Sequence, residues 1–310
     1  MADRDVVEQN IDVNLKAISD YWTEEAMAEA IPIELIRDVS LKELSERAPD
    51  NEPWVQDGIM QQMENTAAQG EFHAYPDADE LPPAALAAGY TTSLVPIGNY
   101  AKFPWQAVGK IYMVFGGKNY VGSAWAIAGT ESCIFTAGHC VYDQKAGWAS
   151  NIKFEARYFN GASAGTWYMK TLYSVKGWTS NGDHKYDMGA GLATQAIRPK
   201  IGALGWMANY PANQGPYTGI GYPAKVIPGY TFNGQQMWQS IGNYVGGSNP
   251  IQAYNNMTGG CSGGPWVVYK SGVPYANGLN SFRYTNDPST MYSPYFGEAF
   301  LNIFNTIKGK

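Results

Sequence analysis

The stretch TGGCSGGPW at residues 258–266 sets a cysteine and a serine side by side among glycines. Small neighbours can present one side chain to a substrate, and a hydroxyl or a thiol can attack an amide bond. Such a nucleophile needs a general base, a third group that orients the base, and backbone donors for the developing oxyanion. Either Cys261 or Ser262 could be this nucleophile, and a thiolate is intrinsically the stronger one.

Candidate bases are few, because the chain has only 3 histidines. His73 lies in an acidic N-terminal stretch, and His184 lies in a polar loop. His139 follows an apolar run in CIFTAGHCVYD, where Ala137 and Gly138 leave room for its ring near a turn. On its own, a histidine in such a run is more often structural than catalytic.

The motifs TAGHC (136–140) and GCSGGP (260–265) together resemble the histidine and serine motifs of trypsin-like serine peptidases. This resemblance implies that His139 is the general base and Ser262 the nucleophile. It also implies that the amides of Gly260 and Ser262 form the oxyanion hole. The alternative is a cysteine-dependent peptidase that uses Cys261, as viral enzymes with the same fold do, although this register would leave Ser262 where a glycine is expected.

The segment KGWTSNGDHKYDMGAGLA (176–193) resembles the part of bacterial glutamyl-endopeptidase-like members that supplies the orienting aspartate. In those proteins the aspartate follows a tyrosine and precedes an apolar strand, which selects Asp187, with Asp183 as the second candidate. Orientation of a neutral imidazole requires a buried carboxylate. Asp187 precedes an apolar stretch and is better placed for burial than Asp183.

The 3 cysteines allow at most one disulfide, so the chain is not a disulfide scaffold. Cys261 stands where trypsin has the aspartate that binds the new N-terminal ammonium, so activation by that route is not available. The resemblance implies a partner for Cys140 near Gly122, where no cysteine is present. Cys140 can pair with Cys133 or Cys261, or stay reduced.

The resemblance also indicates which residues line the substrate pocket. Glutamate-specific relatives carry a histidine at the position of Asn280, with Ser281 beside the catalytic residues and Met257 at the pocket base. Because Asn280 replaces that histidine and Met257 is apolar, we expect a neutral or apolar residue before the scissile bond.

The elements that hold these residues are predicted to be mainly strands. The chain has 310 residues, with 35 glycines, 22 tyrosines and 15% charged residues, and short apolar runs broken by turn residues from about residue 105. Apolar residues at helical spacing over 300–307 predict a C-terminal amphipathic helix. By resemblance, the fold is all-β, with two six-stranded antiparallel β-barrels and the catalytic residues at their junction.

The N-terminal part differs in charge from the rest. Residues 1–80 hold 20 acidic and 5 basic residues, whereas residues 81–310 hold 7 acidic and 16 basic residues. The sequence predicts helices at 24–30 and 58–69 and a helix start with a capping box at 40–43, followed by a proline-rich linker at 74–90. We expect residues 1–90 to be an acidic, mainly helical prosegment and linker that docks on a peptidase domain at 91–310. An acidic solubilising arm is the alternative.

Several other functions lack support in the sequence. There is no apolar run of 18 residues for a membrane helix, no basic cluster for nucleic acid, and no metal or cofactor motif. The first thirty residues do not form a signal peptide, so the chain is either intracellular or has lost a leader. Residues 17–32 resemble prosegments of secreted microbial relatives, which favours secretion. The sequence therefore predicts a secreted serine endopeptidase made as a proenzyme and acting on proteins or peptides, with a catalytically silent binding protein as a further alternative.

Overall fold

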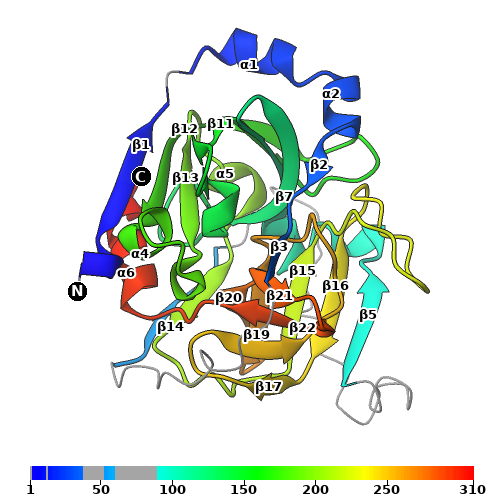
Figure 1. Ribbon diagram of the computed structural model, residues 1–310, viewed down its shortest axis with the longest axis vertical. Coiled ribbons are helices and arrows are strands. Elements are labelled where there is room, and N and C mark those ends of the chain that lie inside the picture. Colours follow the sequence, from blue (N-terminus) through cyan, green and yellow to red (C-terminus); the bar gives the residue numbers. More distant parts are fainter. Residues whose placement is uncertain (1, 12, 38–51, 60–88) are drawn as a thin grey trace, which may run out of the picture.

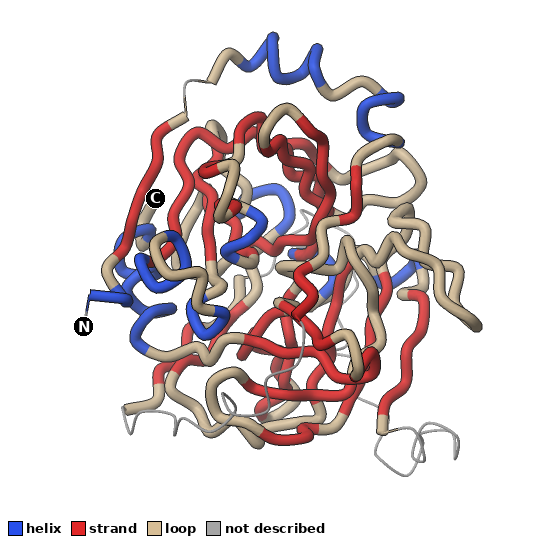
Figure 2. Tube along the Cα trace, viewed as in Figure 1, coloured by secondary structure: helices blue, strands red, loops and turns tan. Residues whose placement is uncertain are grey.

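The computed structural model describes residues 2–11, 13–37, 52–59 and 89–310, and strands dominate it (Figure 1). Two helices of the N-terminal part stand together at one end of the molecule, at the top of Figure 2. No helix in the described part of the chain is long and apolar enough to span a membrane.

The first half of the body is a closed ring of six antiparallel strands. Their order is β12, β11, β6, β7, β8 and β13, and the pairing of β13 with β12 closes the ring. The bounds are β6 Val108–Phe115, β7 Lys118–Ala126, β8 Cys133–Thr136, β11 Ser150–Ala156, β12 Gly165–Val175 and β13 Gly189–Ala193. Trp125, Phe135 and Phe154 are fully buried in its core. One barrel of the predicted fold is therefore confirmed.

The second half consists of two sheets rather than a second closed ring. One sheet has the order β4, β14, β20, β19, β15, β16, β5, and the other has the order β17, β18, β22, β21, β3. The bounds are β4 Trp54–Gln56, β5 Tyr90–Leu94, β14 Gly205–Ala208, β15 Tyr217–Gly221, β16 Trp238–Gly242, β17 Tyr244–Gly246, β18 Ile251–Tyr254, β19 Pro265–Lys270, β20 Val273–Leu279, β21 Phe282–Tyr284 and β22 Asp287–Ser293. The expected second closed barrel is not formed among the described residues. The edge strands are β4 and β5 of one sheet and β17 and β3 of the other, and no strand pairing in the described part of the chain joins the two sheets.

Short elements connect these sheets. They are the 3₁₀ turns Ala2–Arg4 (η1), Ile97–Asn99 (η3), Trp105–Ala107 (η4), Gly138–Cys140 (η5) and His184–Tyr186 (η6), the helices α4 Lys176–Thr179 and α5 Arg198–Ile201, and the strands β9 Tyr142–Asp143 and β10 Gly147–Trp148.

The C-terminal helix α6, Glu298–Ile307, confirms the periodicity of the sequence. Its apolar residues Phe300, Ile303, Phe304 and Ile307 are all buried. The rings of Phe300 and Phe304 lie 4.9 and 4.5 Å from that of Trp206, so the helix joins the core of the body.

The N-terminal segment, residues 2–37, runs along the body as strands and short helices. Its elements are β1 Val6–Asn10, α1 Leu15–Tyr21, α2 Glu24–Ala28, β2 Ile31–Pro32 and β3 Leu35–Arg37. β1 pairs with β12, β2 with β7, and β3 with β21. The helix predicted at 24–30 is confirmed as α2, which Thr23 caps through its hydroxyl. The mainly helical character of residues 1–90 stays a prediction, because the described residues 2–37 hold both helices and short strands. The helix predicted to start with the capping box at 40–43, and most of the one predicted at 58–69, lie outside the described residues.

Candidate active site

His139 and Asp187 form a buried pair at the mouth of the first barrel. Nδ1 of His139 lies 2.8 Å from Oδ2 of Asp187, and the backbone amide of His139 donates to Oδ1 at 2.7 Å. The hydroxyl of Ser281 donates to the same carboxylate. The two contacts to His139 fix both the position and the tilt of the imidazole. This arrangement leaves Nε2 as the ring nitrogen available for proton transfer.

The electrostatics of this pair favour a charged carboxylate. Burial alone would raise the pKa of Asp187, but the charge of His139 and three hydrogen bonds hold it below the usual value. Burial alone would lower the pKa of His139, but the Asp187 carboxylate outweighs burial and raises it well above its usual value. Asp187 is thus favoured as a carboxylate that can orient the ring, and His139 binds a proton more strongly than a free histidine does.

Gly138 permits the close approach between these two residues. A Cβ atom on Gly138 would lie 2.9 Å from Oδ1 of Asp187 and 2.8 Å from Cδ1 of Trp178. The turn η5 that carries His139 follows directly on β8, and Asp187 directly precedes Met188 and β13, which pairs with β8. Adjacent strands thus deliver the base and its carboxylate to the same end of the barrel.

Ser262 lies in the loop between β18 and β19, and glycines shape this loop. Gly260 and Gly263 have φ angles of +97° and +85°, which L side chains rarely adopt. A Cβ atom on Gly263 would meet Oγ1 of Thr136 at 2.0 Å, so the loop is pressed against the barrel that carries His139. The amide of Ser123 in β7 donates to the Ser262 carbonyl at 2.8 Å, which ties the loop to the first half.

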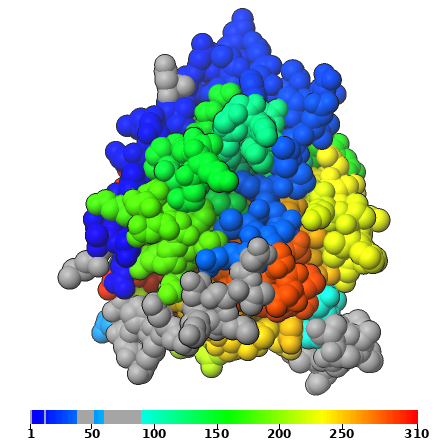
Figure 3. All heavy atoms as spheres, in the orientation of Figure 1, coloured from blue at the N-terminus to red at the C-terminus, as the bar shows by residue number. Residues whose placement is uncertain are grey.

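The N-terminal segment occupies the cleft in front of Ser262. The carbonyl of Ile33 accepts a hydrogen bond from the Gly260 amide at 2.9 Å and from Oγ of Ser262 at 3.2 Å. Nε2 of His139 has no hydrogen-bond partner among the described residues, and Ser262 is only 4% exposed. In Figure 3 the blue segment forms a ridge between the green first half and the orange and yellow second half. The structure is therefore that of a covered site.

Cys261 packs into the core of the second half and also lines the small cavity beside Ser262. It is 2% exposed and clusters with buried residues that include Met257 and Trp266. Burial raises the pKa of its thiol. A protonated, buried thiol is a poor nucleophile. Cys133, Cys140 and Cys261 are all free.

Cys140 lies where the family pattern expects a disulfide. Its Sγ atom is 3.2 Å from the position that a Cβ atom on Gly122 would take. The family resemblance therefore placed Gly122 correctly beside Cys140. Because residue 122 is not a cysteine, Cys140 remains a free thiol.

The residues predicted to line the substrate pocket differ in whether they reach the cavity beside Ser262. Ser281 lies beside Ser262 and bonds Asp187, whereas Met257 is fully buried in the second-half core. The Asn280 amide donates to the carbonyls of Ile220 and Cys261 and accepts from the side chains of Asn255 and Trp266. Four bonds use its full hydrogen-bonding capacity. Direct contacts of Met257 and Asn280 with substrate stay predictions.

Sequence reasoning missed Ser123 and Arg283 of the body, and Glu34 of the N-terminal segment that pairs with Arg283. Ser123 accepts from the Tyr222 amide and donates to the Gly260 carbonyl, which fixes the oxyanion loop. Arg283 follows Ser281 in β21 and forms a close ion pair with Glu34 of the N-terminal segment. Its signal in the sequence was a single arginine two residues after Ser281, in a strand otherwise free of charge.

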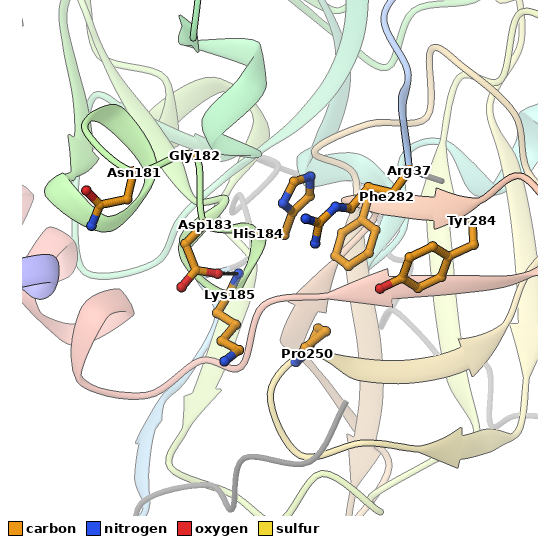
Figure 4. A pocket seen from close by; sticks show the side chains of 9 residues that line it. All are labelled: Arg37, Asn181, Gly182, Asp183, His184, Lys185, Pro250, Phe282 and Tyr284. Atoms are coloured by element: carbon orange, nitrogen blue, oxygen red, sulfur yellow. Dashed lines mark hydrogen bonds between the residues drawn. The ribbon is translucent and has the colours of Figure 1, made fainter. Parts of the chain in front are cut away.

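Asp183, the second candidate for the orienting aspartate, lies apart from His139. It lines a cavity of about 250 Å³ with His184, Arg37, Phe282 and other residues (Figure 4). Its carboxylate caps the turn η6 by accepting from the Lys185 amide at 3.0 Å. The structure thus brings Asp187, and not Asp183, to the histidine.

A buried carboxylate on a histidine, next to a serine in a glycine-shaped loop, defines the site of a chymotrypsin-fold hydrolase. Solved structures agree with this class. The protease Anisep from Arthrobacter nicotinovorans is 31% identical, with a TM-score of 0.61 and coverage of 70% of this chain and 99% of that one. The thermostable serine protease AL20 from an extremophilic microorganism is 29% identical, with a TM-score of 0.60 and coverage of 69% and 99%. The chain belongs to the chymotrypsin-fold serine proteases.

More distant comparisons add detail. A Glu endopeptidase structure, 19% identical with a TM-score of 0.56, covers 70% of this chain and 96% of its own, and it shares the fold. An extracellular metalloprotease of Bacillus subtilis strain 168 is 36% identical over 96 residues, a match that spans 30% of each chain. No model of a known protein family matches. Among the described residues, no cluster of three or more His, Cys, Asp and Glu could hold a metal ion.

Proposed function

We propose that this protein is a serine endopeptidase that works through Ser262, His139 and Asp187 and a covalent acyl-enzyme. The observation that carries the proposal is the bond of Gly260 N–H and Ser262 O–H to one carbonyl oxygen, that of Ile33, beside the His139–Asp187 pair. A peptide carbonyl is thus already bound by one donor of the expected oxyanion hole and by the nucleophile.

The reaction follows from these positions. Ser262 Oγ attacks the substrate carbonyl carbon while Nε2 of His139 takes the hydroxyl proton, and Asp187 stabilises the imidazolium that forms. The amides of Gly260 and Ser262 hold the oxyanion. The imidazolium then gives its proton to the leaving amine, and the acyl-enzyme forms. Water, deprotonated by His139, hydrolyses this ester and releases Ser262.

We also propose that residues 1–90 act as a prosegment and residues 91–310 as the peptidase domain, which keeps a two-barrel architecture in incompletely closed form. Support comes from the segment that crosses the cleft and from its charge. Three of the four described ion pairs between the segment and the body place the acid on the segment, at Asp5 and Glu34. The relative that is an extracellular protease favours secretion and protein substrates.

Labelling with a serine-directed fluorophosphonate tests this function. We expect the probe to modify the wild-type chain and the Cys261→Ala variant after the segment has been loosened, and to leave Ser262→Ala unmodified. Loss of peptidase activity should follow the same pattern. A cysteine-dependent peptidase would give the reverse pattern, with activity kept in Ser262→Ala and lost in Cys261→Ala, and a silent binding protein would show neither labelling nor hydrolysis.

A further inference from the structure

We propose that Arg283 and Lys225 form a carboxylate-binding site beside the nucleophile. Glu34 occupies this site while the N-terminal segment covers the cleft, and an acidic side chain of the substrate takes its place once the segment leaves. The inference rests on the proposed function, because only a peptidase would bring a substrate side chain to this site. It adds Arg283 and Lys225 to that function as specificity-determining residues.

The two cations approach Glu34 from different elements. Arg283 lies in β21, which pairs with β3 in register with Ile36, and its guanidinium forms a close ion pair with Oε1 of Glu34. Nζ of Lys225 lies 3.8 Å from Oε2. The backbone of Lys225 is held on both sides by the Thr258 hydroxyl, which accepts from its amide at 3.1 Å and donates to its carbonyl at 2.7 Å. Thr258 also belongs to the nucleophile loop, so the two cations are fixed to the catalytic frame.

The bound carboxylate lies next to Ser262. The cavity beside the nucleophile is lined by Glu34 together with Gly259, Ser262, Ser281 and Arg283. A Cβ atom on Gly259 would lie 3.0 Å from Cβ of Glu34 and 3.4 Å from its Oε2, so glycine at this position leaves room for an acidic side chain. Because the Ile33 carbonyl bonds the Gly260 amide, the carboxylate belongs to the residue adjacent to the carbonyl held there.

Burial makes the site selective. Arg283 is 8% exposed, and Glu34 is its only ion-pair partner among the described residues. The covered form pairs this guanidinium directly with a carboxylate, and departure of the segment leaves Arg283 without that partner and able to bind another carboxylate. The Asn280 amide offers no competing donor, because protein groups use all four of its bonds. The acidic preference applies to the residue that follows the carbonyl held by Gly260, the position of Glu34, whereas the neutral preference expected before the scissile bond stays a prediction.

Binding to an inactive form tests the site without relying on catalysis. The protein is the full chain with Ser262→Ala and Glu34→Gln, cut at a protease site inserted between residues 59 and 89 so that excess peptide can displace the segment. The probes are two labelled alanine-based peptides that differ only by a central Glu or Gln. We expect the Glu peptide to bind about tenfold more tightly or better, as hydrogen bonds to charged groups give, and 0.5 M NaCl to reduce the difference. Adding Arg283→Gln should bring the ratio near one, whereas Lys118→Gln, an exposed cation in β7, should leave it unchanged.

Two further measurements keep the proposal open to refutation. If Arg283→Gln does not fold, Lys225→Gln substitutes an exposed side chain and should still reduce the ratio several-fold. Equal binding of the two peptides to the parent variant overturns the carboxylate site, even if Ser262 reacts with the fluorophosphonate. A clear preference for Glu in binding, with no labelling of Ser262 in a cut Glu34→Gln chain from which the segment has been released, would instead keep the site and refute the peptidase function. Glu29→Gln, an exposed acid on the same segment, is the matched control for Glu34→Gln.

Discussion

At the scale of single residues, the hydroxyl of Ser262 is hydrogen-bonded to the N-terminal segment and not to His139. It donates to the Ile33 carbonyl, while Nε2 of His139 has no partner in the part of the chain that the structure describes. The His139–Asp187 pair is nevertheless fully formed. Release of Ile33 would leave the Ser262 hydroxyl, like Nε2 of His139, without a hydrogen bond to the segment, which is the state that the proposed reaction requires.

The state of His139 leads to a prediction about its titration. Asp187 raises the pKa of His139, so in Ser262→Ala the ring should titrate with a midpoint above about 6.5, the usual value for histidine. The ring is then protonated below that midpoint and able to accept a proton only above it. Asp187→Asn removes the charge and leaves burial, so the midpoint should fall. Ring-proton NMR measures both, and Asp183→Asn, which alters an aspartate apart from His139, should cause no shift. A midpoint unchanged by Asp187→Asn would contradict the assignment.

At the scale of elements, glycines set the distance between the strand ends that carry the site. Gly138 lets the turn after β8 approach the residues that precede β13, and Gly263 lets the nucleophile loop contact Thr136. The contacts are made to backbone atoms and to the buried side chains of Trp178, Asp187 and Thr136, which have little room to move aside. The geometry of the candidate site thus depends on glycine at positions 138 and 263 as much as on His139 and Ser262.

Gly138→Ala should therefore lower stability and activity together. Its Cβ atom would overlap Asp187 Oδ1 and the Met188 amide, and relief requires the histidine turn to shift; overpacking of this kind costs about 1–3 kcal/mol. Gly98→Ala, where no atom lies within 4 Å, should stay within about 0.5 kcal/mol of the parent. Urea unfolding measures the free energy of both variants. Equal midpoints and slopes for the two would refute the packing argument.

Elements of the body could be predicted from the sequence, whereas the path of the segment could not. The helical spacing of apolar residues in α6 and the apolar run before His139 are local signals that the sequence alone displays. The motifs at 136–140 and 260–265 are likewise recognised from neighbouring residues alone. β2 and β3 carry no such signal: IP and LIR become strands because β7 and β21 offer free edges. Asn280 was placed in a pocket by its position in the sequence, but the number of its hydrogen bonds depends on four distant partners. The ion pair of Arg283 could not be predicted from the sequence, because its partner Glu34 lies far away in the chain.

At the scale of the whole molecule, the N-terminal segment joins both halves of the body. β1 extends the first sheet along β12, β2 adds to β7, β3 adds to β21, and β4 adds to β14. Trp22 anchors the stretch between β1 and β2, because it is 4% exposed and its Nε1 donates to the Asn151 carbonyl at 2.6 Å. Many weak attachments spread over two halves give a cover that local fraying does not remove.

This distribution predicts that cutting the chain does not by itself release the segment. A specific protease site inserted between residues 59 and 89 would separate the segment from the body, and we expect the two fragments to remain together on gel filtration at low salt. Activity on a fluorogenic peptide should stay low in this complex, because strand pairing and the Glu34 ion pairs persist after the cut. Raising the salt concentration screens the more exposed pairs and should release the fragment and increase hydrolysis in parallel. The same cut in a Glu34→Gln chain should release it at lower salt, and Glu29→Gln should behave as the parent. Immediate full activity of the cut parent chain at low salt, with separated fragments, would show that the segment does not act as a cover.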